Sequence, residues 1–176
     1  RRSHFRKVRD YQNNPLKKDN EVSLIGQMLD RMRQDNQRLQ KILQENESDV
    51  RLEFLTDLLN GLVEDNKQLE QRSHAAGVNL NGNAFAALSV LPEGSGSLES
   101  LFQNLPDDVL VFAGCRLHAL RSTGDRTVPV LAVLDDADPA NYAHCIGQLQ
   151  KTAAAGGLLL TIGAGNLVTD PLQLGR

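Results

Sequence analysis

The feature that most constrains the fold is a repeat of apolar side chains at seven-residue intervals across residues 21–50. One series recurs every seven residues, and a second series follows it three residues later. Placed at the a and d positions of a heptad, the two series make a seam of about four heptads, which predicts a coiled coil. The seam residues are Val22, Ile25, Leu29, Met32, Asn36, Leu39, Leu43, Asn46 and Val50.

Asn36 occupies an a position in this seam. Paired Asn side chains bond across a parallel dimer and fix its register, so the predicted partner is a second copy of the chain, aligned in parallel. Met28 and Ile42 at g positions broaden the apolar face. A trimer, or a single helix packed on its own domain, therefore remains as an alternative.

The composition changes after Arg72. Most of the charged residues lie before it, whereas most of the 14 Gly and 6 Pro lie after it. This shift predicts a helical rod followed by a compact domain of helices and strands. We divide the chain into a basic juxtamembrane segment at 1–20, a coiled-coil helix at 21–50, connecting helices at 51–77 and a sheet domain at 78–176.

Turn and cap residues place the elements of the second part. Gly77 is expected to end a helix, Gly114 to mark a bend, and Asp138 with Pro139 to begin a helix. The predicted order of strand, helix, hairpin, helix and strand favours an α+β, ferredoxin-like antiparallel sheet with helices on one face. The expected strands are 85–91, 109–112, 116–121, 128–134 and 158–162, and the expected helices are 64–76, 98–105 and 138–154.

The overall composition excludes several classes of protein. Nothing in the chain approaches the ~18 apolar residues of a membrane span, and no secretory signal opens it. The net charge of -3 offers no general attraction to nucleic acid. Two Cys, at 115 and 145, are too few for a disulfide framework, so we expect a reducing, cytoplasmic setting.

Motifs that would carry chemistry are weak. Gly163, Ala164 and Gly165 follow a predicted strand, but Val168 stands where the third glycine of a dinucleotide fingerprint would fall. The acidic residues at 135–138 are typical of a strand-to-helix turn with an N-cap, although they could attract a divalent cation. The four His are not at metal-ligand spacing. We therefore expect no catalytic, cofactor-binding or metal-binding residue.

The basic segment at 1–9 is followed by Pro15, which disfavours the unbroken basic helix of a DNA-binding zipper. Lys and Arg also gather on the cytoplasmic flank of membrane helices, and we prefer that interpretation. Because Arg1 is not preceded by Met, we expect the chain to be an excised piece of a longer protein.

These parts, in this order, resemble a region of membrane-anchored AraC-type transcription regulators of bacteria. The resemblance rests on a YxxNPL segment at 11–16, the heptads at 21–43, the helical segment 51–80, and the strands within 84–91 and 158–174. It covers nearly the whole chain. It implies a coiled coil followed by a degenerate GGDEF-like linker domain, truncated at its C-terminus, on the cytoplasmic side of the membrane.

Active diguanylate cyclases of the GGDEF family carry a metal-binding Asp on the first strand and a Gly-Gly-Asp-Glu-Phe turn. Here the first strand has no Asp, and the turn reads Ser122, Thr123, Gly124, Asp125, Arg126. A two-metal site needs several carboxylates, so the resemblance implies a non-catalytic segment that dimerises and transmits a signal. DNA would be bound by a downstream module, and the membrane would be reached through an upstream one. The alternatives are a cyclase-like or nucleotide-binding domain and a coiled-coil scaffold.

Overall fold

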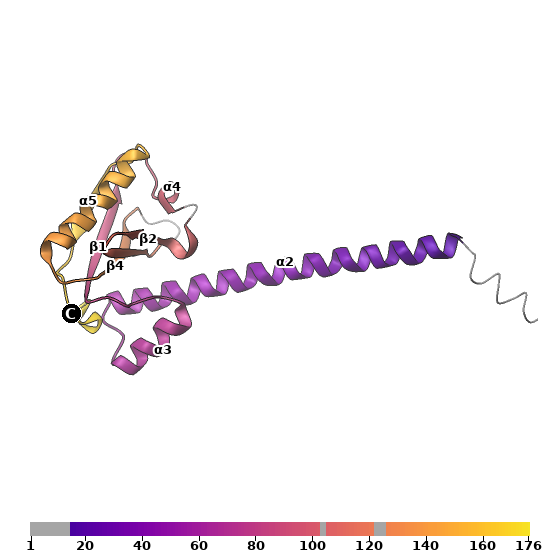
Figure 1. The fold of residues 1–176 in the computed structure, drawn as a ribbon, viewed down its shortest axis with the longest axis horizontal. Helices are drawn as coiled ribbons and strands as arrows, with labels where there is room; N and C mark the ends of the chain where they lie inside the picture. The colour runs from indigo at the N-terminus through magenta and orange to yellow at the C-terminus, as the bar shows by residue number, and fades with distance from the viewer. Residues whose placement is uncertain (1–14, 103–104, 122–125) are drawn as a thin grey trace, which may run out of the picture. The chain divides into compact units, whose positions relative to one another are not determined.

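The structure is a computed structural model that describes residues 15–102, 105–121 and 126–176 (Figure 1). The chain divides into two units, residues 1–46 and 47–176. The basic segment at 1–9 and most of the predicted cyclase-like turn lie outside the described residues.

The first described element is the long helix α2, Pro15–Leu59. It begins at Pro15, because the fixed backbone angle of proline suits the first turn of a helix and its missing N–H needs no partner there. The helix continues past residue 50, where we had expected a change to connecting helices. The reason is local: the residues after Val50 are Leu-rich and contain no Gly or Pro before Gly61. Every described side chain from Lys18 to Val50 is exposed.

A second helix, α3 (Asn66–Ala76), begins two residues later than predicted and ends at the predicted cap, Gly77. The carboxylate of Asp65 accepts a hydrogen bond from the backbone N–H of Gln68, and Gly77 ends the helix in the left-handed conformation, with φ 66°. Asp57 of α2 and Arg72 of α3 form an ion pair at 2.7 Å, which joins the two helices.

The five strands form one antiparallel sheet with the order β2-β3-β4-β1-β5. Strand β1 pairs along one side with β4 and along the other with edge strand β5, so that Leu88 lies between Val130 and Ala164. Without the edge strand β2, the connectivity is the β-α-β-β-α-β plan that we predicted. The strands are β1 (Ala84–Pro92), β2 (Val109–Phe112), β3 (Cys115–Ala119), β4 (Val128–Leu134) and β5 (Leu160–Ala164).

One face of the sheet is covered by helices α4 (Glu99–Phe102) and α5 (Pro139–Ala155). Asp138 caps α5 by accepting from the N–H of Ala140, as predicted. Leu117 and Leu134 from the strands and Leu149 from α5 meet in this core with at most 1% exposure. Burying a side chain of this kind is worth about 1.5–3 kcal/mol. The domain's own helices thus lie on one face, as expected.

The opposite face is covered too, which the sequence analysis did not predict. Phe54, Leu55 and Leu58 from the end of α2 pack against Phe85 and other residues of the sheet. The spacing of these three side chains puts them on one side of the helix. The segments 51–77 are therefore a structural layer of the domain rather than connectors.

Among the described residues, no helix combines the length and the apolar character needed to cross a membrane.

Candidate functional site

The predicted dimer seam lies along α2, and its apolar side chains are accessible. In the single chain their exposed fractions run from 40% at Val50 to 63% at Val22. Asn36 and Asn46 are exposed as well. A row of exposed Val, Ile, Leu and Met at heptad spacing is unfavourable in water unless another apolar surface covers it. The structure therefore presents the seam predicted from the sequence as an uncovered apolar surface.

The positions that the sequence resemblance would align with a cyclase site hold no acidic cluster in the described part of the chain. Strand β1 carries no Asp, and no group of three or more His, Cys, Asp or Glu suitable for a metal ion occurs among the described residues. Arg126, which the resemblance aligns with an acidic residue of the cyclase turn, donates through Nη2 to the carbonyl oxygen of Gly94. Its guanidinium is thus bound to the turn after β1.

Two other predicted sites have structural explanations. Gly165 lies against β1, where an added Cβ would come within 2.7 Å of the Ala87 carbonyl oxygen. Close packing between strands explains this glycine without a phosphate. In the acidic turn, Asp136 accepts from the N–H of Asp138 at 3.1 Å, and Asp138 caps α5. The turn is an N-cap, the interpretation that the sequence favoured.

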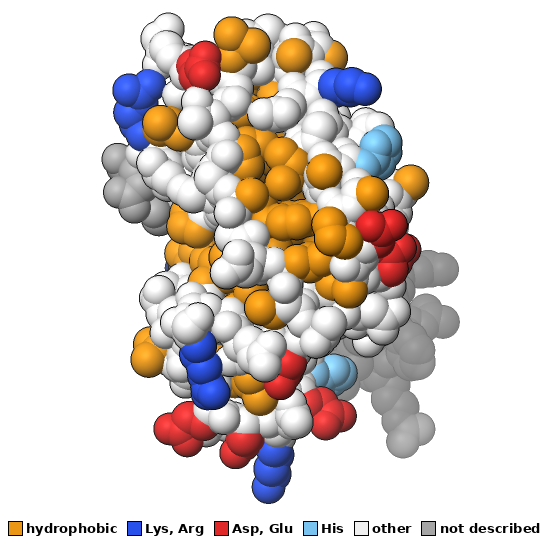
Figure 2. Space-filling model, turned by 90° about the vertical axis from the view of Figure 1, so that its left-hand side faces the viewer, with side chains coloured by type: hydrophobic (Ala, Val, Ile, Leu, Met, Phe, Trp, Pro, Cys, Tyr) orange, Lys and Arg blue, Asp and Glu red, His pale blue; other side chains and the backbone are white. Residues whose placement is uncertain are grey.

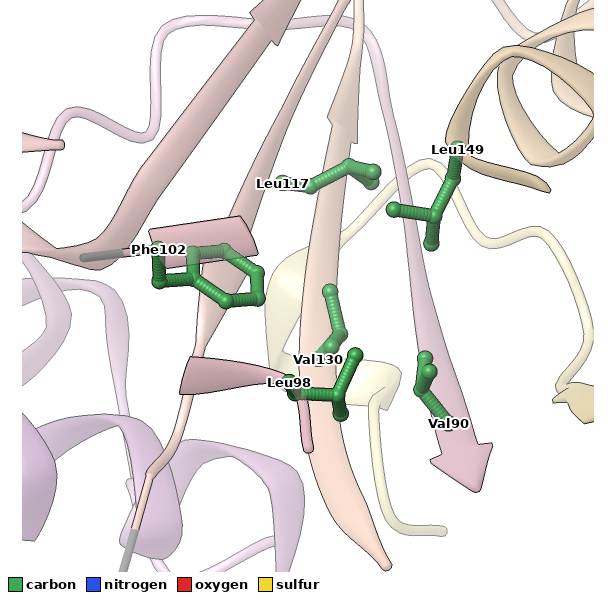
Figure 3. Close-up of a pocket in the computed structure, with 6 residues that line it drawn as sticks. All are labelled: Val90, Leu98, Phe102, Leu117, Val130 and Leu149. Carbon is green, nitrogen blue, oxygen red and sulfur yellow. The ribbon is translucent and has the colours of Figure 1, made fainter. Parts of the chain in front are cut away.

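The apolar space between the sheet and its helices is part of the core. Val90, Leu117 and Val130 project from the strands toward Leu149 of α5, and Leu98 and Phe102 close the other side (Figure 3). The six side chains leave no space for a water molecule. This region stabilises the domain and offers no ligand site.

A further apolar surface lies between α5 and β5. Tyr142, Ile146, Ile162 and Leu167 are partly buried there against the core. The phenol of Tyr142 donates to the carbonyl oxygen of Gly165 at 2.8 Å, and burial raises its pKa. On the side of the molecule where α5 and the C-terminus lie, hydrophobic side chains gather in a central band (Figure 2).

Cys115 of β3 and Cys145 of α5 form a disulfide, with Cα atoms 6.5 Å apart. The exposed fractions of the two residues are 3% and 2%. Two cysteines are too few for a disulfide framework, but they form this single bond. The sequence did not predict the bond, because the two side chains meet only when α5 packs on the sheet.

The sequence analysis missed a group of charged residues where the end of α2 meets the sheet. We call Arg51, Asp107, Asp108 and Arg121 the arginine–aspartate cluster. Arg51 of α2 bonds to Asp107 at 2.8 Å, and Arg121 bonds to Asp108 at 2.5 Å. Arg51 is largely buried, its side chain being 13% exposed.

The two aspartates of this cluster have an unusual backbone. Asp107 and Asp108 follow Pro106 and have φ values of 63° and 55°. The left-handed region costs an ordinary residue about 1–2 kcal/mol, although Asp and Asn tolerate it better than most. Two such residues in succession make this turn strained. Sequence signals for it are weak, because Pro-Asp-Asp equally fits an unstrained turn.

His118 lies beside the cluster, on the face of β3 that α2 and α3 cover. It is 4% exposed, and neither ring nitrogen makes a hydrogen bond with regular geometry. Burial, followed by the positive charges of Arg116 and Arg51, lowers the pKa of His118 from 6.5 to about 4, against an opposing effect of a hydrogen bond with the Asn79 backbone. His118 is therefore neutral in the folded protein at neutral pH.

This lowered pKa predicts a loss of stability in acid. The unfolded chain binds a proton at His118 near pH 6.5, whereas the folded chain does so only near pH 4. The stabilisation is therefore complete above pH 6.5 and is lost as the pH falls to 4, by about 3 kcal/mol. The free energy of unfolding of His118→Leu, measured in urea across this pH range, should not show this loss. His144→Gln, which alters an exposed histidine, is the control variant. If the stability of His118→Leu fell with pH in parallel with that of the unaltered chain, the assignment of the acid loss to His118 would be refuted.

Comparison of the chain with protein-family models, with curated proteins and with solved structures finds no match in any of the three.

Proposed function

We propose that this chain is a non-catalytic dimerisation and signal-transmission segment of a bacterial transcription regulator. It would join a membrane sensor upstream to a DNA-binding module downstream. The observation that carries the proposal is the uncovered seam on α2. Its heptad spacing, its apolar side chains and Asn36 at an a position together suit a parallel pair of identical helices.

The role in transmission rests on the continuity of α2. One unbroken helix runs from Pro15 to Leu59, and it carries the seam in one part and Phe54, Leu55 and Leu58 of the domain core in another. A rotation or a change of spacing in a dimeric seam would therefore have a continuous helical path to the sheet domain. The proposal is that the dimeric seam has two arrangements, and that the change between them is coupled to a change in the sheet domain.

The non-catalytic part of the proposal rests on the residues at the corresponding cyclase positions. Strand β1 has no Asp, and Arg126 is bound to a backbone carbonyl instead of supplying a carboxylate. The AraC-type assignment, the GGDEF-like domain and the cytoplasmic side of the cell membrane come from the sequence resemblance.

Disulfide cross-linking tests the parallel arrangement. In a parallel dimer the two copies of residue 25 face each other across the seam, whereas in an antiparallel dimer they lie near opposite ends. Ile25→Cys is expected to form a covalent dimer under mild oxidation, seen on a non-reducing gel. Ser23→Cys adds the same thiol outside the seam and should stay largely monomeric on that gel. Equal cross-linking of both variants, or of neither, would count against a parallel seam.

A further inference from the structure

The arginine–aspartate cluster connects α2 to the sheet through a strained turn. Arg51 directly follows Val50, the last residue of the seam, and its guanidinium bonds to Asp107 at 2.8 Å. The neighbouring residue of the turn, Asp108, bonds to Arg121 just after β3 at 2.5 Å. One short turn thus receives a contact from the helix on one side and from the sheet on the other.

The ion pairs oppose the strain of the turn. Asp107 and Asp108 both have positive φ values, a conformation that residues with a side chain rarely adopt. Such a conformation persists only where surrounding contacts hold it in place. Among the described residues, the side chains that bond to the carboxylates of this turn are Arg51 and Arg121. When one of these bonds is lost, the turn is still strained but is held in place by only the other bond.

The surroundings of the cluster leave room for its arginine side chains to rearrange. A polar cavity of about 20 Å³ lies between α2 and the turn, lined by Ser48, Arg51, Asp108 and Arg121 among others. That volume holds about one water molecule. The Nε atoms of Arg51 and Arg121 are buried without a hydrogen-bond partner. The two guanidinium groups therefore have unused donors and space beside them for another arrangement.

We propose that the Pro106–Asp108 turn is a two-state latch that couples α2 to the edge of the sheet. In the engaged state Arg51 and Arg121 hold the turn in its left-handed conformation. In the released state the Arg51–Asp107 bond is broken, the turn relaxes to negative φ, and both β2 and the last turns of α2 loosen. This inference rests on the proposed function, since the latch gives the rotation of a dimeric seam a place to act.

Two substitutions at one position separate strain from charge. Asp107→Ala and Asp107→Gly both remove the carboxylate, but only glycine adopts the left-handed conformation without cost. Hydrogen–deuterium exchange is measured in β2 (Val109–Phe112) and in residues 51–59 of the whole chain. Asp107→Ala is expected to speed exchange in both segments about tenfold, which corresponds to the cost of one left-handed residue. Asp107→Gly should exchange nearly as slowly as the unaltered chain.

Arg51→Met provides a second route to the released state, from the side of the helix. It should speed exchange in the same two segments, and far-ultraviolet circular dichroism would verify that the fold is retained. Equal exchange in Asp107→Ala and Asp107→Gly would overturn the role of strain. Faster exchange in only one of the two segments would overturn the coupling.

The same comparison in a monomeric background separates the latch from the proposed function. With Leu29→Glu and Leu43→Glu present, the difference between the Ala and Gly variants should persist, because the latch lies within a single chain. If the unaltered chain is monomeric but the two variants differ in exchange, the proposed function is refuted and the latch is not. If the chain is dimeric but the two variants exchange alike, only the latch is refuted.

Discussion

The combination of Leu29→Glu and Leu43→Glu is expected to halve the molar mass measured in solution, from that of a dimer to that of a single chain. Both residues occupy a positions, and their exposed fractions in the single chain are 56% and 60%. In a parallel dimer each new carboxylate would lie in an apolar seam opposite its copy, where it could be neither hydrated nor paired. Size-exclusion chromatography with light scattering measures the change.

The matched control adds the same charge elsewhere on the helix. Gln27→Glu with Gln34→Glu introduces two carboxylates at exposed positions outside the seam, and the dimer mass should be retained. The helix content of the Leu double variant should also be lower than that of the Gln double variant, because a helix without a packing partner is marginally stable in water. An unchanged mass for the Leu variant would show that the heptads do not form the interface.

Breaking the Cys115–Cys145 bond is expected to lower the free energy of unfolding by about 3.5 kcal/mol. The bond closes a loop between residues 30 positions apart, and this figure is the chain entropy that such a loop removes from the unfolded state. Guanidinium unfolding with and without a reductant measures the difference. Because both sulfurs are buried, reduction of the folded protein should also be slow.

Cys115→Ala with Cys145→Ala is the control for this experiment. The double variant should unfold at a lower denaturant concentration than the oxidised chain, and the reductant should leave its midpoint unchanged. If the unaltered chain instead yields two free thiols without denaturant and is equally stable in reductant, the bond contributes nothing and the prediction fails.

The sequence predicted the elements whose signals are local. The bounds of β2 and β4 were predicted as the structure has them, because both are apolar runs between turn residues. The caps at Gly77 and Asp138 were also confirmed, since each depends on one side chain or on its absence. The α+β class and the antiparallel sheet followed from the order of these elements.

What the sequence did not predict depends on contacts between distant residues. The end of α2 covers a face of the sheet, and its Leu stripe looks the same in a connector as in a core. Cys115 meets Cys145 only because α5 packs on β3. Strand β5 begins two residues later than predicted, because Gly157 turns the chain at φ 79° and Leu158 packs into the core before the strand starts.

The charged residues show the same limit. His118 alternates with apolar residues along β3, a pattern that also fits a solvent-facing position. Its burial follows from the arrival of Arg51 and α2 on that face. The pairing of Arg51 with Asp107 joins residues 56 positions apart, and local spacing carries no information about it.

The central claim is that α2 holds two copies of this chain together. Sedimentation equilibrium of the unaltered chain, over a wide range of concentration, tests it most directly. The account predicts twice the mass of one chain, falling toward the single-chain mass only on dilution. A single-chain mass at every concentration would contradict it.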